Sequence, residues 1–124
     1  VVPNEQQELV AIYAQNIARE LLGINLKVNF VKASTNTVAQ YGNRILTFNV
    51  NKLANSFWLN PINLKVTELL IHELGHSAGS HTDFTYHELI CSLGARLTEK
   101  ALADPDWFVL VLNKPEIDVV GEED

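Results

Sequence analysis

The sequence predicts an α+β fold in which helices pack on one face of a small, mainly antiparallel sheet. Three observations predict this class. Apolar residues recur at helical spacing over residues 9–21, alternate with polar residues over residues 26–50, and return to helical spacing over residues 62–102. The expected order is therefore one helix, three strands and two further helices.

The first helix is expected to begin after Asn4 and to end at Gly23. Asn4 is a suitable N-cap, and Gln7 stands three residues later as a capping-box partner. Gly23 occupies the place where a residue in the left-handed conformation often ends a helix. The apolar side of this helix consists of Leu9, Ile12, Tyr13, Ile17 and Leu21.

The middle of the chain is predicted to form three strands. Leu26, Val28 and Phe30 alternate with polar residues, which is typical of a half-buried strand. A second strand is expected over 37–41 and a third over 44–50, with Gly42 and Asn43 as the turn signal between them. Residues 51–60 are ambiguous and compatible with a short helical turn.

Two helices are expected in the second half of the chain. The dipeptide Asn60-Pro61 predicts the start of one, because proline is tolerated in a first turn, and this helix is expected to end near Gly79. Ser80 and Asp83 resemble a cap and its partner for the next helix, which should stop before Pro105. The apolar positions are Ile62, Val66, Leu69, Leu70 and Leu74 in one helix, and Leu89, Ile90, Leu93, Leu97 and Leu102 in the other.

Composition argues against several classes of function. The net charge of −6 argues against a general nucleic-acid binder, which needs clustered Lys and Arg. No apolar run approaches the ~20 residues that a membrane-spanning helix requires. Cys91 is the only cysteine, so one chain has neither an internal disulfide nor a multi-thiolate metal site. With no secretory signal visible at the start, these features predict a cytoplasmic domain.

The 124 residues are expected to form a single domain. The chain starts at Val1 rather than at a methionine, which indicates that it was trimmed, processed or cut from something longer. We expect it to be one module of a longer protein, in which additional domains are possible. Acidic residues gather in about 113–124, which we expect to be a solvated acidic tail.

The motif that carries chemistry is His72-Glu73-Leu74-Gly75-His76. Two histidines four residues apart on a helix project from one face about one turn apart, so both imidazoles can bind one metal ion. Glu73 follows His72 directly and lies beside the metal, where it can accept a proton from a metal-bound water. The motif therefore predicts a Zn²⁺ site at which activated water attacks a peptide carbonyl, with Glu73 as the general base.

This motif resembles the active-site helix of the zincin metallopeptidases. The segment 44–50 stands where zincins place the edge strand above the active-site cleft. The segment Tyr86-His87-Glu88-Leu89-Ile90-Cys91-Ser92-Leu93-Gly94-Ala95 is similar to the helix that follows the motif in zincin-like domains of phage and plasmid anti-restriction proteins. The resemblance covers about half of the chain. It implies a zinc peptidase of the gluzincin or minimal-zincin type, whose peptide or protein substrate pairs with the edge strand.

The third metal ligand has two candidates. Glu88 is the gluzincin-like choice, a carboxylate from the next helix. His81 is the alternative. Gly79 matches the glycine that metzincins have after the second histidine. Their third ligand would fall at position 82, where this chain has Thr82, and His81 comes one residue earlier. We expect Glu88 to complete the site, because a stripe of mostly small residues would let its helix approach the motif helix closely. The stripe consists of Glu88, Cys91, Ser92 and Ala95.

Five further residues have functional or structural interpretations. Tyr86 is a candidate substrate-binding residue that donates a hydrogen bond to an oxyanion, and its alternative is packing in the core or rim. Asp83 lies in a string that resembles the aspzincins, and its alternative is a helix cap. Cys91 is expected to be a small buried apolar residue rather than a nucleophile. Trp58 and Trp107 are expected to anchor the core or an interface.

The sequence leaves two main functions open. The first is a zinc metallopeptidase-like hydrolase. The alternative is a catalytically silent zincin-like metal-binding module that acts in protein–protein interaction or regulation, since fold does not dictate activity. A third is a metal-free interaction domain. We expect no contact with nucleic acid or membrane in any of the three.

Overall fold

The first helix, α1 (Glu5–Leu22), has the two ends that the sequence predicts. Asn4 Oδ1 accepts a hydrogen bond from the Gln7 N–H at 2.8 Å, and Gln7 Oε1 accepts one from the Asn4 N–H at 2.9 Å. Gly23 ends the helix in the left-handed conformation with φ 68°. The small residues Ala11, Ala14 and Ala18 are all buried, which lets α1 lie close to the elements around it.

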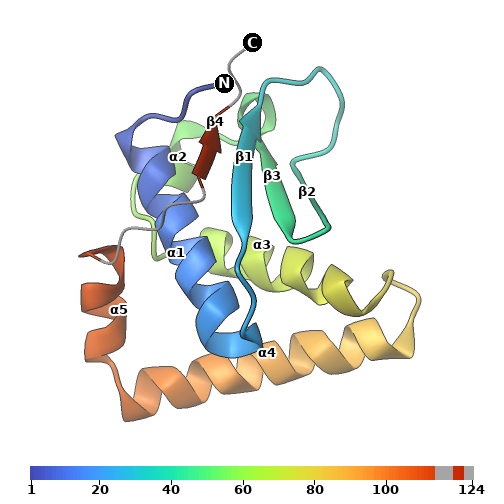
Figure 1. Ribbon diagram of the computed structural model, residues 1–124, viewed down its shortest axis with the longest axis vertical. Coiled ribbons are helices and arrows are strands. Elements are labelled where there is room, and N and C mark those ends of the chain that lie inside the picture. The colour runs from blue at the N-terminus through green and yellow to red at the C-terminus, as the bar shows by residue number, and fades with distance from the viewer. Residues whose placement is uncertain (114–118, 122–124) are drawn as a thin grey trace.

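The computed structural model describes residues 1–113 and 119–121 and has an α+β architecture, as predicted (Figure 1). Its sheet has the order β2-β3-β1-β4. The strands are β1 (Lys27–Val31), β2 (Ala39–Gly42), β3 (Ile45–Asn49) and β4 (Val119–Gly121).

The sheet is mixed, so the prediction of a mainly antiparallel sheet is wrong. β1 runs parallel to both β3 and β4, and within the described part of the chain the antiparallel pairing is confined to β2 and β3. The alternation of apolar residues predicts a strand and its buried face but not its direction. Here the chain returns through a loop and β2 before β3 forms, so β3 has the direction of β1.

The edge strand near the motif helix is β2, whereas the sequence analysis gave this place to 44–50. β3 occupies that segment and lies between β2 and β1. The turn between β2 and β3 consists of Asn43 and Arg44, which have φ of 51° and 63°. Two left-handed residues in a two-residue loop are typical of a tight hairpin, whose twist matches that of its strands. This hairpin places β2 beside the motif helix.

The motif helix, α3 (Leu64–Gly75), begins three residues later than Pro61. Asn63 is its N-cap, because its Oδ1 accepts a hydrogen bond from the Val66 N–H at 2.9 Å. A 3-10 turn (His76–Ala78) continues α3 as far as Gly79, near the predicted end. Figure 1 shows α3 lying between the sheet and α4.

The next helix, α4 (Phe84–Ala103), ends before Pro105 as predicted, but its N-cap is Asp83 and not Ser80. A short helix that the sequence analysis did not predict, α5 (Asp106–Leu110), follows and continues into a 3-10 turn (Val111–Asn113). The buried ring of Trp107 lies in α5. Within the described residues, no helix has the length and hydropathy needed to cross a membrane.

An aromatic cluster fixes the segment between the sheet and α3. The ambiguous residues 51–60 include the end of a 3-10 turn (Val50–Lys52) and all of α2 (Asn55–Trp58). Trp58 lies against Phe48 and Phe57, with ring centroids 5.5 and 4.8 Å away. Phe30 and Phe48 stack at 5.6 Å. Trp58 is buried in the core as predicted, and it holds α2 against the sheet next to the start of α3.

The expectation of a solvated acidic tail over 113–124 is wrong for residues 119–121, which form a strand of the sheet. Val119–Gly121 pairs with β1 as β4. Asn113 belongs to the last 3-10 turn. The acidic residues of this stretch, at 116, 118 and 122–124, lie outside the described residues.

Candidate metal centre

The C-terminal half of α3 presents His72 on the side away from the core. Leu70 and Leu74, on the other side of the helix, are almost completely buried. The His72 side chain keeps 43% of its surface exposed. His76 follows one turn later, as the first residue of the 3-10 turn. The two imidazoles therefore project from one side of α3, as the motif predicts.

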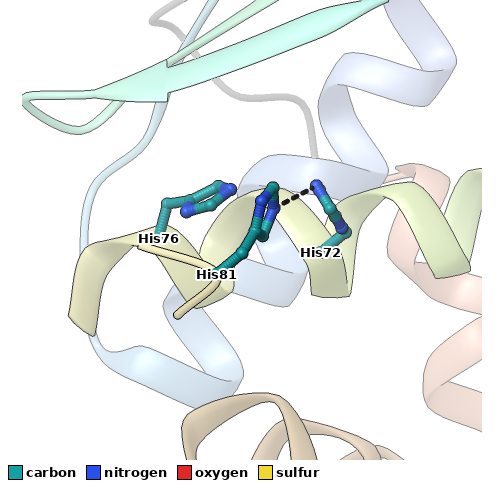
Figure 2. A group of neighbouring side chains, drawn as sticks. All are labelled: His72, His76 and His81. Carbon is teal, nitrogen blue, oxygen red and sulfur yellow. Dashed lines mark hydrogen bonds between the residues drawn. The ribbon is translucent and has the colours of Figure 1, made fainter. Parts of the chain in front are cut away.

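His81 joins these two histidines. Its Nε2 lies 3.1 Å from His72 Nε2, and its ring centroid is 4.5 Å from that of His76. One ligand nitrogen from each of the three residues lies within 4.8 Å of the other two. Figure 2 shows the three rings facing one another. Among the described residues, these three form the one group of three or more potential ligands this close together.

A tight turn brings His81 back over α3. Gly79 begins the turn with φ 140°, a backbone conformation that side chains rarely permit. Asp83 then closes it, because its Oδ2 accepts hydrogen bonds from the Ser80 N–H at 2.8 Å and from the Ser80 hydroxyl at 3.3 Å. Asp83 therefore closes the turn with its side chain. It also stands at the N-cap position of α4, the predicted structural alternative, but its side chain makes no capping hydrogen bond to that helix.

Hydrogen bonds at the outer nitrogens orient the motif histidines. His76 Nδ1 lies 2.9 Å from the Gly79 carbonyl oxygen, so this nitrogen carries the proton and donates. His72 Nδ1 lies 3.3 Å from the Tyr86 hydroxyl. In both residues Nε2 is left as the nitrogen that can bind a metal. Outer partners of this kind fix the orientation of metal-binding imidazoles.

Tyr86 lies behind the histidines and not in the cleft. It is 4% exposed, and its ring centroid is 4.9 Å from that of His76. The prediction that Tyr86 binds substrate is not supported by this position, because its hydroxyl is directed at His72 Nδ1. Burial raises the pKa of this hydroxyl, with the Glu73 carboxylate as a second cause, so the phenol stays protonated at neutral pH.

The preferred third ligand, Glu88, is not among the three clustered residues. It is exposed on the first turns of α4. The face of α4 that meets α3 carries Tyr86 and Ile90, which a Cβ added to Gly75 would contact at 2.9 and 2.5 Å. Glu88 is two positions away from both Tyr86 and Ile90, so its side chain points about 200° around the helix from theirs. The alternative, His81, lies in the cluster instead.

The stripe of small residues on α4 is not the surface that packs against α3, although this contact was expected. α4 does pack closely on Gly75, as predicted, but through the larger side chains of Tyr86 and Ile90. Cys91 lies in the stripe and is exposed, so the expectation of a buried residue is wrong. The inward face of a helix is set by what it packs against, and residue spacing within α4 does not show that Tyr86 and Ile90 make this contact.

Glu73 is buried beside the histidines. Its side chain is 7% exposed, and its Oε2 lies 3.8 Å from His72 Nε2. Burial raises the pKa of this carboxyl, and the nearby His76 lowers it in part. Glu73 also lines a pocket of about 590 Å³ together with His72. Its carboxylate therefore faces a space that water or substrate can enter, as a general base requires.

The donor set fits zinc. In a tetrahedral site with Zn–N distances of 2.0–2.1 Å, two ligand nitrogens lie about 3.3–3.4 Å apart. The 3.1 Å between His72 and His81 Nε2 is close to this value. Burial, followed by the neighbouring His81 and His76, lowers the pKa of His72. The neutral imidazole, which is the form that binds metal, is thereby favoured.

The geometry thus brings together two predicted ligands, the predicted base and the alternative third ligand. Residue spacing gave no signal for the hydrogen bonds by which Asp83 closes the turn and by which Tyr86 and the Gly79 carbonyl orient the histidines. Comparisons of this chain with protein families, curated proteins and solved structures gave no match.

Proposed function

We propose that this chain is a zinc-dependent, zincin-like metallopeptidase domain in which His72, His76 and His81 hold the metal. The convergence of the three imidazoles is the observation that supports this most. A buried carboxylate 3.8 Å from one ligand nitrogen adds the base that hydrolysis needs. Three neutral nitrogen ligands leave one position open in a tetrahedral zinc site, as catalytic sites do.

Zinc bound there would polarise a carbonyl group and lower the pKa of a coordinated water to about 7. The chain's own part is proton transfer and positioning. Glu73 accepts a proton from the attacking water as the new C–O bond forms. It then returns this proton to the amide nitrogen as the C–N bond breaks, so no proton is gained or lost overall. Tyr86 and the Gly79 carbonyl keep the imidazoles turned toward the metal.

The proposed substrate is an extended peptide or an unfolded protein segment. β2 is the terminal strand of the described sheet and lies along α3 and the 3-10 turn that carries His76. An extended chain can pair with the free edge of such a strand. We place the domain in the cytoplasm, where its single, exposed thiol, Cys91, remains reduced.

The test compares zinc-loaded wild-type protein with Glu73→Gln on a reduced, denatured protein substrate. The amide has the size of the carboxylate but cannot accept the proton, so this variant should keep one zinc and its thermal stability while losing cleavage. Glu88→Gln makes the same chemical change at an exposed carboxylate and should retain full activity. Equal cleavage by wild type and Glu73→Gln would refute the role of Glu73. Zinc binding without any wild-type cleavage would instead favour the catalytically silent module.

A further inference from the structure

Two recesses of different character flank the three histidines. A pocket of about 590 Å³ opens on the side of His72 and Glu73, and a smaller one of about 380 Å³ opens on the side of His76. β2 connects them: Val38, just before the strand, lines the first pocket, and Tyr41 and Gly42 line the second. An extended chain that pairs with β2 would therefore pass both recesses.

The larger pocket, which we call the His72-side pocket, has an apolar floor. Leu53, Phe57 and Leu69 line it and are half-buried against the core. Phe57 is held edge-on against Trp58, so this wall is fixed by the aromatic cluster. The volume lies within the range of small-ligand sites, and the lining suits a large aliphatic or aromatic side chain.

The smaller recess, which we call the His76-side recess, is lined by one permanent cation, Arg44. Arg44 has φ 63° at the hairpin turn, where glycine or asparagine is usual. An arginine there costs conformational energy that a glycine would not. Within the described chain, Arg44 has no ion pair with a carboxylate, although the protein as a whole is acidic. A strained, unpaired cation beside a candidate active site indicates a functional role.

We propose that the cleft recognises a peptide with a large apolar side chain in the His72-side pocket and a carboxylate at Arg44 in the His76-side recess. This inference rests on the proposed function and names its substrate class. β2 runs from the first recess to the second. A peptide paired antiparallel to it, the slightly more stable arrangement, runs the opposite way. The acidic residue then precedes the cleaved bond, and the apolar residue follows it.

The test of recognition measures binding, so it does not depend on turnover. Zinc-loaded Glu73→Gln is titrated into fluorescent peptides that carry Glu before and Phe after a central bond. Replacing the Phe by Ala should weaken binding at least about tenfold, because an apolar side chain loses its buried contacts. Replacing the Glu by Lys should weaken it about two- to fivefold, as expected for an exposed ion pair. Equal affinity for all three peptides would overturn the proposal.

Variants of the chain then assign each preference to its recess. In the Glu73→Gln background, Arg44→Glu should reverse the preference, so that the Lys peptide binds better than the Glu peptide. Lys32→Glu makes the same charge change at an exposed residue that lines neither recess and should leave the preference unaltered. Ser56→Trp should fill the His72-side pocket and abolish the Phe preference. Its control is Asn55→Trp, an exposed neighbour outside the lining. Loss of either preference in both variant and control would refute the assignment.

Cleavage-site sequencing separates this inference from the proposed function. Wild-type zinc protein that cuts a peptide mixture between acidic and large apolar residues supports both. Cleavage with no enrichment on either side overturns the inference and leaves the peptidase proposal standing. If no cleavage occurs, the peptidase proposal fails, and the binding preferences alone decide whether the cleft recognises these side chains.

Discussion

His72 Nε2 and His81 Nε2 lie 3.1 Å apart, although the two histidines are nine positions apart in the sequence. The turn that brings them together has Gly79 at a positive φ and is closed by Asp83. This geometry brings three histidines together although the last spacing is one residue shorter than that of the metzincins, which the motif otherwise resembles. The shortened loop thus still lets the three imidazoles meet.

His81→Ala should weaken zinc binding far more than Glu88→Ala. The first change removes one of three imidazoles, whereas the second removes an exposed carboxylate that is not part of the cluster. Loss of an outer partner typically costs about 10–100-fold in metal affinity, so loss of a direct ligand should exceed that range. Competition with a chromogenic chelator measures both affinities. A larger loss in Glu88→Ala would return the third-ligand role to Glu88.

Gly75→Ala should destabilise the protein by about 1–3 kcal/mol, although alanine is the better helix former. The added methyl group would meet Ile90 Cγ2 and Tyr86 Cε1 at 2.5 and 2.9 Å, so α3 and α4 would have to separate. Gly94→Ala is the matched control within α4, since nothing lies within 4 Å of its added Cβ. That variant should gain about 0.5–1 kcal/mol. Urea unfolding of the two variants measures both effects, and a stabilised Gly75→Ala would contradict the close packing.

Arg44→Gly should stabilise the fold by roughly 1 kcal/mol, because glycine adopts the left-handed conformation without a steric penalty. Arg44→Ala also removes the guanidinium but keeps the Cβ, so it should bring no such gain. Thermal and chemical unfolding compare the two variants with wild type. If Arg44→Gly is no more stable than Arg44→Ala, the backbone at position 44 is not strained by its side chain.

Local features of the sequence predicted the parts of the fold that depend on neighbouring residues. The capping box of Asn4 and Gln7 and the left-handed Gly23 bound α1 as expected. His72 and Glu73 lie in the last turn of α3, and His76 follows at the start of the 3-10 turn, because the spacing of the motif settles their positions once a helix forms.

The features that sequence reasoning got wrong depend on contacts between distant segments. The direction of β3 relative to β1 is set by how the chain returns, which alternation does not encode. The choice of Glu88 is not supported, because α4 packs on Gly75 through Tyr86 and Ile90 and leaves Glu88 exposed on another side of the helix. His81 reaches the motif histidines through turn contacts of Gly79 and Asp83, which residue spacing alone did not reveal.

The most direct test of a three-histidine zinc centre is X-ray absorption at the zinc edge, combined with metal stoichiometry, on the zinc-loaded wild-type chain. The account predicts one zinc per chain, bound by three imidazole nitrogens at about 2.0–2.1 Å and one further oxygen, with no sulfur ligand. His72→Ala, His76→Ala and His81→Ala should each remove one imidazole from the spectrum and lower the thermal stability of the zinc-loaded protein. A protein that neither retains nor rebinds zinc, or a spectrum with fewer than three imidazoles in the wild type, would contradict it.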